Sequence, residues 1–116
     1  MNLSHVHIQA LSVDESVKFY TENLGFRELG RQEGIAFLRD ENGLDFVIDP
    51  SPSGDPIPSS VHIGFRRQTP EEVAEAYEEL KDRVEICQPL VENDGFTLFS
   101  MKDPNDMMVE VFYSAL

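Results

Sequence analysis

An internal repeat constrains the fold of this chain more than any other feature. Shifting the sequence by 57 residues aligns residues of like chemistry near the start of each half: His5 with His62, Ser12 with Thr69, Glu15 with Glu72, and Tyr20 with Tyr77. Further on, Asp40 of "DENG" aligns with Asp103 of "DPND" at a shift of 63, which indicates an insertion inside the second half. The 116 residues therefore read as one domain built from two modules, each of about 55 residues.

Each half predicts the order strand, helix and three strands. In the first half, a capping box of Ser12 and Glu15 begins the helix and Gly25 ends it. In the second half, Thr69 and Glu72 form the equivalent box before a helix over 70–83. The strands are expected at 5–10, 26–30, 35–40 and 44–49, and then at 60–65, 84–88, 96–101 and 107–113. The fold class is therefore α+β, with two βαβββ modules.

A proline-rich stretch separates the two modules. The segment "PSPSGDPIPSS" (50–60) contains four prolines in eleven residues and cannot continue a helix or a central strand. We therefore expect module one at about 1–50, a linker at 50–60 and module two at about 61–116, together forming a single domain.

Charge and composition exclude several classes of function. The formal net charge of −13, from 22 acidic and 9 basic residues, repels nucleic acids and anionic membrane surfaces. No apolar run approaches the ~20 residues that span a bilayer, and the first residues lack a signal-peptide layout. A cytoplasmic location is the expectation. The single cysteine, Cys87, lies in an apolar stretch and is expected to be a buried thiol.

Two histidines and one glutamate form a candidate metal site. His5 and His62 occupy equivalent first strands, which a pseudo-two-fold domain brings near each other. Glu110 interrupts the otherwise apolar strand "MMVEVFY", and a buried carboxylate needs a partner. Two imidazoles and one carboxylate form a facial ligand set for a divalent ion and leave coordination positions open. Each of these residues taken alone is also compatible with a structural or exposed position.

His7 shares a strand face with His5, so two roles are open for it. It is either a group that supports the metal site or contacts the substrate, or a side chain that only lines a polar cavity.

These residues, in this order, resemble the vicinal oxygen chelate superfamily, the glyoxalase/bleomycin-resistance/dioxygenase proteins. "SHVHIQALSVDESVKFYTENLGF" is similar to the opening signature of that family, and "KDPNDMMVEVF" to its closing signature. The resemblance covers essentially the whole chain. It implies a curled mixed sheet around a cavity, with His5, His62 and Glu110 as ligands of one divalent metal ion (Fe²⁺, Mn²⁺, Ni²⁺ or Zn²⁺).

The resemblance implies an enzyme that acts on a small substrate chelating the metal through adjacent oxygens, with Glu110 and His7 as catalytic residues. Many relatives have a fourth ligand where this chain has Val47, while Asp45 and Asp49 lie on the same strand face. No set of basic residues suited to glutathione carboxylates or a phosphonate is evident, and no subfamily matches fully. The alternative is a metal-free bleomycin-resistance-type binding protein, which the acidity would suit if the drug is cationic. A homodimer is expected from the family.

Overall fold

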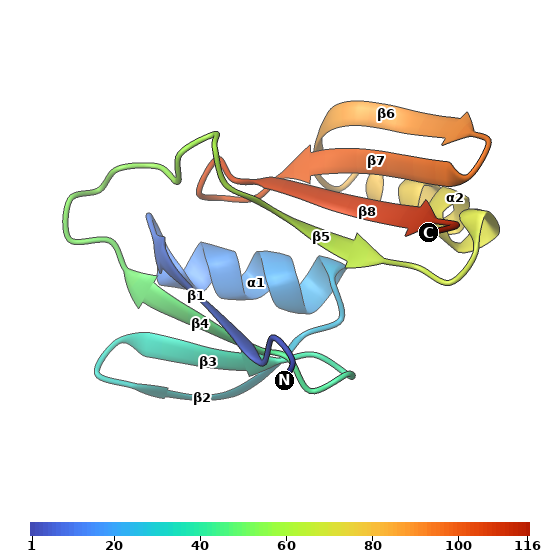
Figure 1. Ribbon diagram of the computed structural model, residues 1–116. Coiled ribbons are helices and arrows are strands. Elements are labelled where there is room, and N and C mark those ends of the chain that lie inside the picture. The colour runs from blue at the N-terminus through green and yellow to red at the C-terminus, as the bar shows by residue number, and fades with distance from the viewer. The chain divides into compact units, whose positions relative to one another are not determined.

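The computed structural model describes residues 1–116, which divide into two compact units (Figure 1). Unit 1 spans Met1–Ile57 and unit 2 spans Pro58–Leu116, so the boundary falls inside the predicted linker. Each unit is described by itself. That the two units form one domain stays a prediction. No helix in the chain is long and apolar enough to cross a bilayer.

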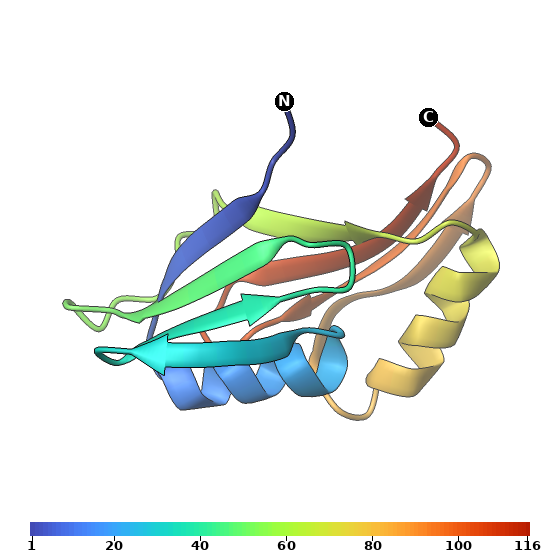
Figure 2. The same ribbon diagram turned by 90° about the horizontal axis from the view of Figure 1, so that it is seen from below.

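Unit 1 contains a four-stranded mixed sheet and one helix. Its elements are β1 (His5–Ala10), α1 (Val13–Asn23), β2 (Arg27–Gln32), β3 (Ile35–Arg39) and β4 (Asp45–Pro50). The strand order is β1-β4-β3-β2; β1 is parallel to β4, and the other neighbours are antiparallel. Figure 2 shows α1 along one face of this sheet. The other face carries no helix.

Aromatic packing between α1 and the sheet forms the core of unit 1. Tyr20, Phe26 and Phe46 are buried, and the rings of Tyr20 and Phe46 have centroids 4.5 Å apart. Phe26 contacts both rings edge-on, at centroid distances of 5.8 and 5.5 Å. Aromatic pairs in such geometry stabilise a core beyond the area they bury. The "FY" and "LGF" segments of the sequence therefore fix α1 against β4.

Unit 2 repeats this architecture. Its elements are β5 (His62–Arg66), α2 (Pro70–Leu80), β6 (Glu85–Asn93), β7 (Phe96–Lys102) and β8 (Met108–Ser114). The strand order is β5-β8-β7-β6, with β5 parallel to β8. The predicted α+β class with two βαβββ modules is confirmed, and each module has its own four-stranded mixed sheet.

The N-cap hydrogen bond of each predicted capping box is present at matching positions, while the Glu72 carboxylate accepts from the backbone N–H of Gln68 rather than that of Thr69. The Ser12 hydroxyl accepts from the backbone N–H of Glu15, and the Thr69 hydroxyl accepts from that of Glu72, both at 3.2 Å. At its other end, α2 stops at Leu80 rather than at 83. The Leu80 carbonyl there accepts from the backbone N–H groups of both Arg83 and Val84, which closes the helix with a turn.

The hairpin of β6 and β7 contains most of the insertion inferred from the two shifts. Relative to unit 1, unit 2 has one more residue between helix and hairpin, three more in the first strand and two more in the second. Strand β6 therefore continues through Pro89, beyond the predicted end at 88. A proline is tolerated there because β6 is an edge strand.

The expectation that Cys87 is buried is wrong. Cys87 is exposed on β6, where the pairing with β7 shifts register between Ile86 and Gln88. A bulge leaves one residue of the bulged strand unpaired. The apolar neighbours of Cys87 in the sequence therefore do not determine which way it faces.

Equivalent aspartates organise the turn before the last strand of each unit. In unit 1 the Asp40 carboxylate accepts from the N–H groups of Asn42 and Leu44 at 2.9 and 2.8 Å. In unit 2 the Asp103 carboxylate accepts from those of Asn105 and Met107 at 2.8 and 2.9 Å. The same two-residue and four-residue spacings recur, so this turn sets the same hairpin register in both units.

We expect Asp103→Ala to destabilise the protein more than Asp40→Ala. Asp103, Asn105 and Met107 are buried, so the truncation leaves two backbone N–H groups and the Asn105 side-chain amide without this acceptor, at a cost of about 2–4 kcal/mol. Asp40 is only half-buried and Asn42 is exposed, so water replaces part of the loss, and about 1 kcal/mol is expected. Urea denaturation of both variants measures the difference. Equal losses would contradict this account of the turn.

Candidate functional site

The strand alternation of unit 1 places its two histidines on the face without the helix. Ile8 and Ala10 of β1 are buried, whereas His5, His7 and Gln9 are exposed. Alternate residues of a strand point to opposite faces, so these three side chains lie on the face opposite α1. On the neighbouring strand β4 the register pairs them with Asp45, Val47 and Asp49.

One of these cross-strand neighbours holds His7. The Nε2 atom of His7 lies 3.3 Å from Oδ2 of Asp49. An ionised carboxylate only accepts hydrogen bonds, so the contact favours the tautomer with its proton on Nε2. The Nδ1 atom of His7 is then free to accept a proton.

A hollow of about 590 Å³ opens over the same face of unit 1. Its volume lies within the ~300–1,000 Å³ typical of small-molecule sites. It is lined by residues of β2, β3 and β4 together with the start of β1: Ser4, His5, Leu29, Gly30, Arg31, Gln32, Phe37, Leu38, Arg39, Asp45 and Val47. His5, a predicted metal ligand, therefore belongs to the lining, and His7 does not.

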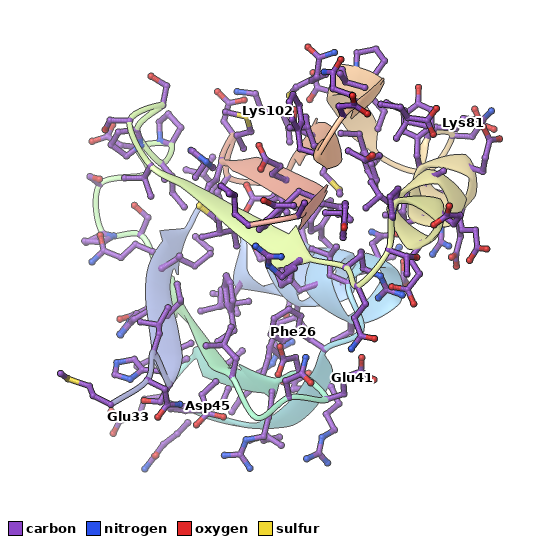
Figure 3. All side chains as sticks on the ribbon, turned by 45° about the vertical axis from the view of Figure 1, so that its right-hand side comes forward. Phe26, Glu33, Glu41, Asp45, Lys81 and Lys102 are labelled. Atoms are coloured by element: carbon purple, nitrogen blue, oxygen red, sulfur yellow. The ribbon has the colours of Figure 1, made fainter.

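An ion pair between Arg39 and Asp45 lies in this lining. Asp45 projects from β4 (Figure 3), and its two carboxylate oxygens accept from Nε and Nη2 of Arg39 at 2.6 and 3.2 Å. This hydrogen-bonded guanidinium lowers the pKa of the Asp45 carboxyl below its ordinary value, and the nearby His5 lowers it slightly further. The same pairing raises the pKa of Arg39, so both groups are charged at neutral pH.

In unit 2, His62 and Glu110 lie on one face of one sheet. The register pairs His62 with Met108 and Gly64 with Glu110 across β5 and β8. Met108 and Glu110 are two residues apart on β8, so Glu110 shares a face with His62 one pairing step along the ladder. Glu110 is half-buried between the buried residues Val109 and Val111.

The backbones of His5, His62 and Glu110 pair in the strand ladders, but none of their three side chains makes a hydrogen bond or ion pair. This distinguishes the three predicted ligands from His7 and Asp49, which contact each other.

The ladders also define which positions of the two units correspond. In unit 1 the register pairs His5 with Asp45 and His7 with Val47, and in unit 2 the equivalent pairs are His62 with Met108 and Gly64 with Glu110. Val47 therefore stands in unit 1 where Glu110 stands in unit 2. A valine provides no donor for a metal, so unit 1 supplies no counterpart of Glu110.

The position equivalent to His7 in unit 2 is Gly64, and it packs closely against Phe112. A Cβ atom added to Gly64 would lie 3.1 Å from the ring of Phe112. The Arg66 guanidinium carbon lies 5.3 Å from the centroid of the same ring, within the range of a cation–π contact. A side chain at this position would therefore require the Phe112 ring to shift.

The structure thus brings together two of the three predicted ligands, His62 and Glu110, on one sheet of unit 2. His5 lies on the equivalent strand of unit 1, and its approach to the other two stays a prediction. Sequence reasoning missed the role of Arg39. The signal that could have found it is the antiparallel pairing of β3 with β4, which places Arg39 opposite Asp45.

Comparison with known proteins identifies the family. The family model of the Glyoxalase/Bleomycin resistance protein/Dioxygenase superfamily matches residues 2–111. The chain belongs to this superfamily. A curated relative, "Glyoxylase I 4" of Arabidopsis thaliana, is 28% identical over 122 residues, covering 95% of this chain and 69% of the relative. The resemblance inferred from the sequence is therefore confirmed.

Solved structures of the superfamily share the fold. A glyoxalase/bleomycin resistance protein/dioxygenase from Nocardioides superposes with a TM-score of 0.82 at 20% identity, covering 98% of this chain and 83% of that chain. A possible glyoxalase from Bacillus cereus gives 0.80 at 22% identity, covering 96% and 97%. A fosfomycin resistance protein from Listeria monocytogenes gives 0.76 at 20% identity, covering 100% and 93%. At these identities the likeness shows the fold alone.

The Asp45 carboxyl is expected to titrate below the ~3.9 of an unperturbed aspartate, and Arg39→Gln to return it toward that value. The folded-state pKa is lowered, so the pair stabilises the fold above the unfolded pKa, and this contribution is lost as pH falls through the folded pKa. Carbon-detected NMR of the side-chain carboxyl measures both titrations. Arg31→Gln is the control, because that guanidinium binds Asp14 and Glu28 instead. An unshifted Asp45 in wild type would contradict the pairing.

Proposed function

We propose that the protein is a divalent-metal-dependent enzyme of the glyoxalase/dioxygenase type, with His5, His62 and Glu110 as metal ligands. The observation that carries this proposal is the geometry of β5 and β8. Their register sets an imidazole and a half-buried carboxylate on one sheet face, and neither group has a partner in the chain. A carboxylate in an apolar strand without an internal partner is costly unless a cation compensates it.

The donor set fits a divalent ion of borderline hardness. Imidazole nitrogens and one carboxylate suit Fe²⁺, Mn²⁺, Ni²⁺ or Zn²⁺, and three protein ligands leave positions open for a substrate. When bound, such an ion acts as a Lewis acid on the adjacent oxygens of a small substrate. Val47 contributes no fourth ligand, so the protein itself provides three donors only.

His7 is the residue that we propose to move a proton. The Asp49 carboxylate orients the imidazole through Nε2 and leaves Nδ1 as the accepting atom. The carboxylate also stabilises the imidazolium that forms when Nδ1 takes up a proton. Glu110, the other predicted catalytic residue, acts in this scheme by holding the metal.

Metal binding tests the ligand set. We expect His5→Ala, His62→Ala and Glu110→Gln each to weaken Mn²⁺ binding by more than the 10–100-fold that loss of an outer hydrogen-bond partner costs. Isothermal titration of chelator-treated protein measures the affinity, and elemental mass spectrometry measures the metal content after purification without nickel.

Two variants make this test selective. Glu92→Gln removes an exposed carboxylate of β6 and is expected to leave Mn²⁺ affinity unchanged. Val47→Glu supplies the missing donor, and we expect tighter Mn²⁺ binding. Unchanged affinity in the His62 and Glu110 variants would refute the metal site and leave the metal-free binding protein as the remaining interpretation.

We also propose that the protein acts on a small molecule as a homodimer. Strands β1 and β5 are edge strands, so each presents an unpaired side within its own sheet. Exposed edges are available for pairing with a further strand. Light scattering after size exclusion at micromolar concentration is expected to give twice the mass of the chain, and a monomeric mass would contradict the proposal.

A further inference from the structure

The lining of the unit 1 hollow differs in charge from the protein as a whole. The chain has 22 acidic and 9 basic residues, yet the hollow is lined by two arginines, Arg31 and Arg39, and a single acidic residue, Asp45. Arg31 directs its guanidinium to Asp14 and Glu28. Arg31 thus has two carboxylate partners, whereas Arg39 has one, so Arg39 is the better candidate to bind an anionic ligand.

Arg39 retains hydrogen-bond donors after it has bound Asp45. A guanidinium has five N–H donors in a planar fork, and Asp45 occupies the side formed by Nε and Nη2. The end of the fork, with one N–H from Nη1 and one from Nη2, has no partner in the chain. Two parallel N–H groups at this spacing match the two oxygens of a carboxylate. The Arg39 side chain is 40% exposed, so a ligand can reach it.

The rest of the hollow is shaped for an apolar group. Phe37 and Val47 are cross-strand neighbours on the face without the helix, and Leu29 adds to the lining. Gly30 stands opposite Phe37 on β2, where a side chain would otherwise occupy the space. A Cβ atom added to Gly30 would meet no atom within 4 Å. The φ angle of Gly30 does not lie in the left-handed region, so its backbone conformation does not require glycine. The absence of a side chain at this position therefore adds to the volume of the hollow.

We propose that the unit 1 hollow binds small carboxylic acids with an apolar or aromatic body, and that Arg39 is the residue that selects the carboxylate. This names a substrate class for the same site and rests on the proposed function, because His5 is both a lining residue and a proposed metal ligand. Asp45 has two effects here. It holds the Arg39 fork in place, and it competes with the ligand for the positive charge.

The test uses metal-free protein, so that it is independent of metal binding. Phenylacetate and its neutral isostere phenylacetamide are titrated to millimolar concentrations into ¹⁵N-labelled protein with chelator present. We expect phenylacetate to bind at least about tenfold more tightly and to shift the Arg39 Nε–H and the amides of Gly30 and Gln32. A third probe, benzylphosphonate, distinguishes a carboxylate subsite from one for phosphonates or phosphates.

Four variants assign the effect. Arg39→Gln is expected to abolish the preference for phenylacetate over phenylacetamide. Asp45→Asn removes the competing charge and is expected to tighten phenylacetate binding several-fold. Gly30→Leu fills the hollow and is expected to block both probes. Arg83→Gln, the matched control, removes an arginine of unit 2 that lies outside the hollow and is expected to change neither affinity.

The proposal is overturned if Arg39→Gln keeps the preference, if both probes bind equally to the wild type, or if the shifts lie outside the hollow. It is also overturned if benzylphosphonate binds more tightly than phenylacetate, or if no probe binds. Gly30→Leu keeps the test valid should Arg39→Gln fail to fold. If the metal-binding experiment shows that His5, His62 and Glu110 bind no metal, these titrations of metal-free protein keep their meaning. The two proposals can therefore be refuted independently.

Discussion

The parallel pairing of the first strand with the last strand is the constraint on which each unit depends. It joins residues 40 positions apart in unit 1, such as His5 and Asp45, and residues 46 positions apart in unit 2, such as His62 and Met108. The last strand also pairs with the strand before it, in an antiparallel register of its own. The aspartate turn fixes that register, because Asp103 accepts from two N–H groups of the loop that leads into β8. These buried N–H groups need an acceptor, so the turn holds β7 and β8 in one register. That register determines the face of the sheet on which Glu110 lies.

The two units share one strand order and register but carry different side chains at equivalent positions. Where unit 1 pairs His7 with Val47, unit 2 pairs Gly64 with Glu110, so the polar residue changes strands between the units. Packing favours the difference, since a side chain in place of Gly64 would require the Phe112 ring to shift. This asymmetry agrees with the proposed division of roles, in which unit 2 contributes a pair of metal donors and unit 1 contributes one donor, a proton acceptor and the hollow.

Sequence reasoning succeeded where the relevant interactions are local. Capping boxes act over three residues and the aspartate turns over four, so Ser12, Thr69, Asp40 and Asp103 could be identified from spacing alone. The paired shifts of 57 and 63 then gave the module order. A relation between strands was harder to infer. The exposure of Cys87 depends on a register shift in β6, which no local pattern encodes.

Arg39 was missed because its pairing with Asp45 is also a relation between strands. For the same reason, the net charge of the chain is a poor guide to the charge around one site. A charge of −13 suggests a cationic ligand, but 16 of the 22 acidic residues are exposed and are therefore solvated and screened. Within the unit 1 sheet, Asp45 is paired with Arg39 and Asp49 contacts His7, so neither carboxylate is free to attract a cation. What a ligand meets in the hollow is decided by donors a few ångströms away, because nearby charges in a partly enclosed site outweigh distant screened ones. An acidic protein can in this way present a local anion site.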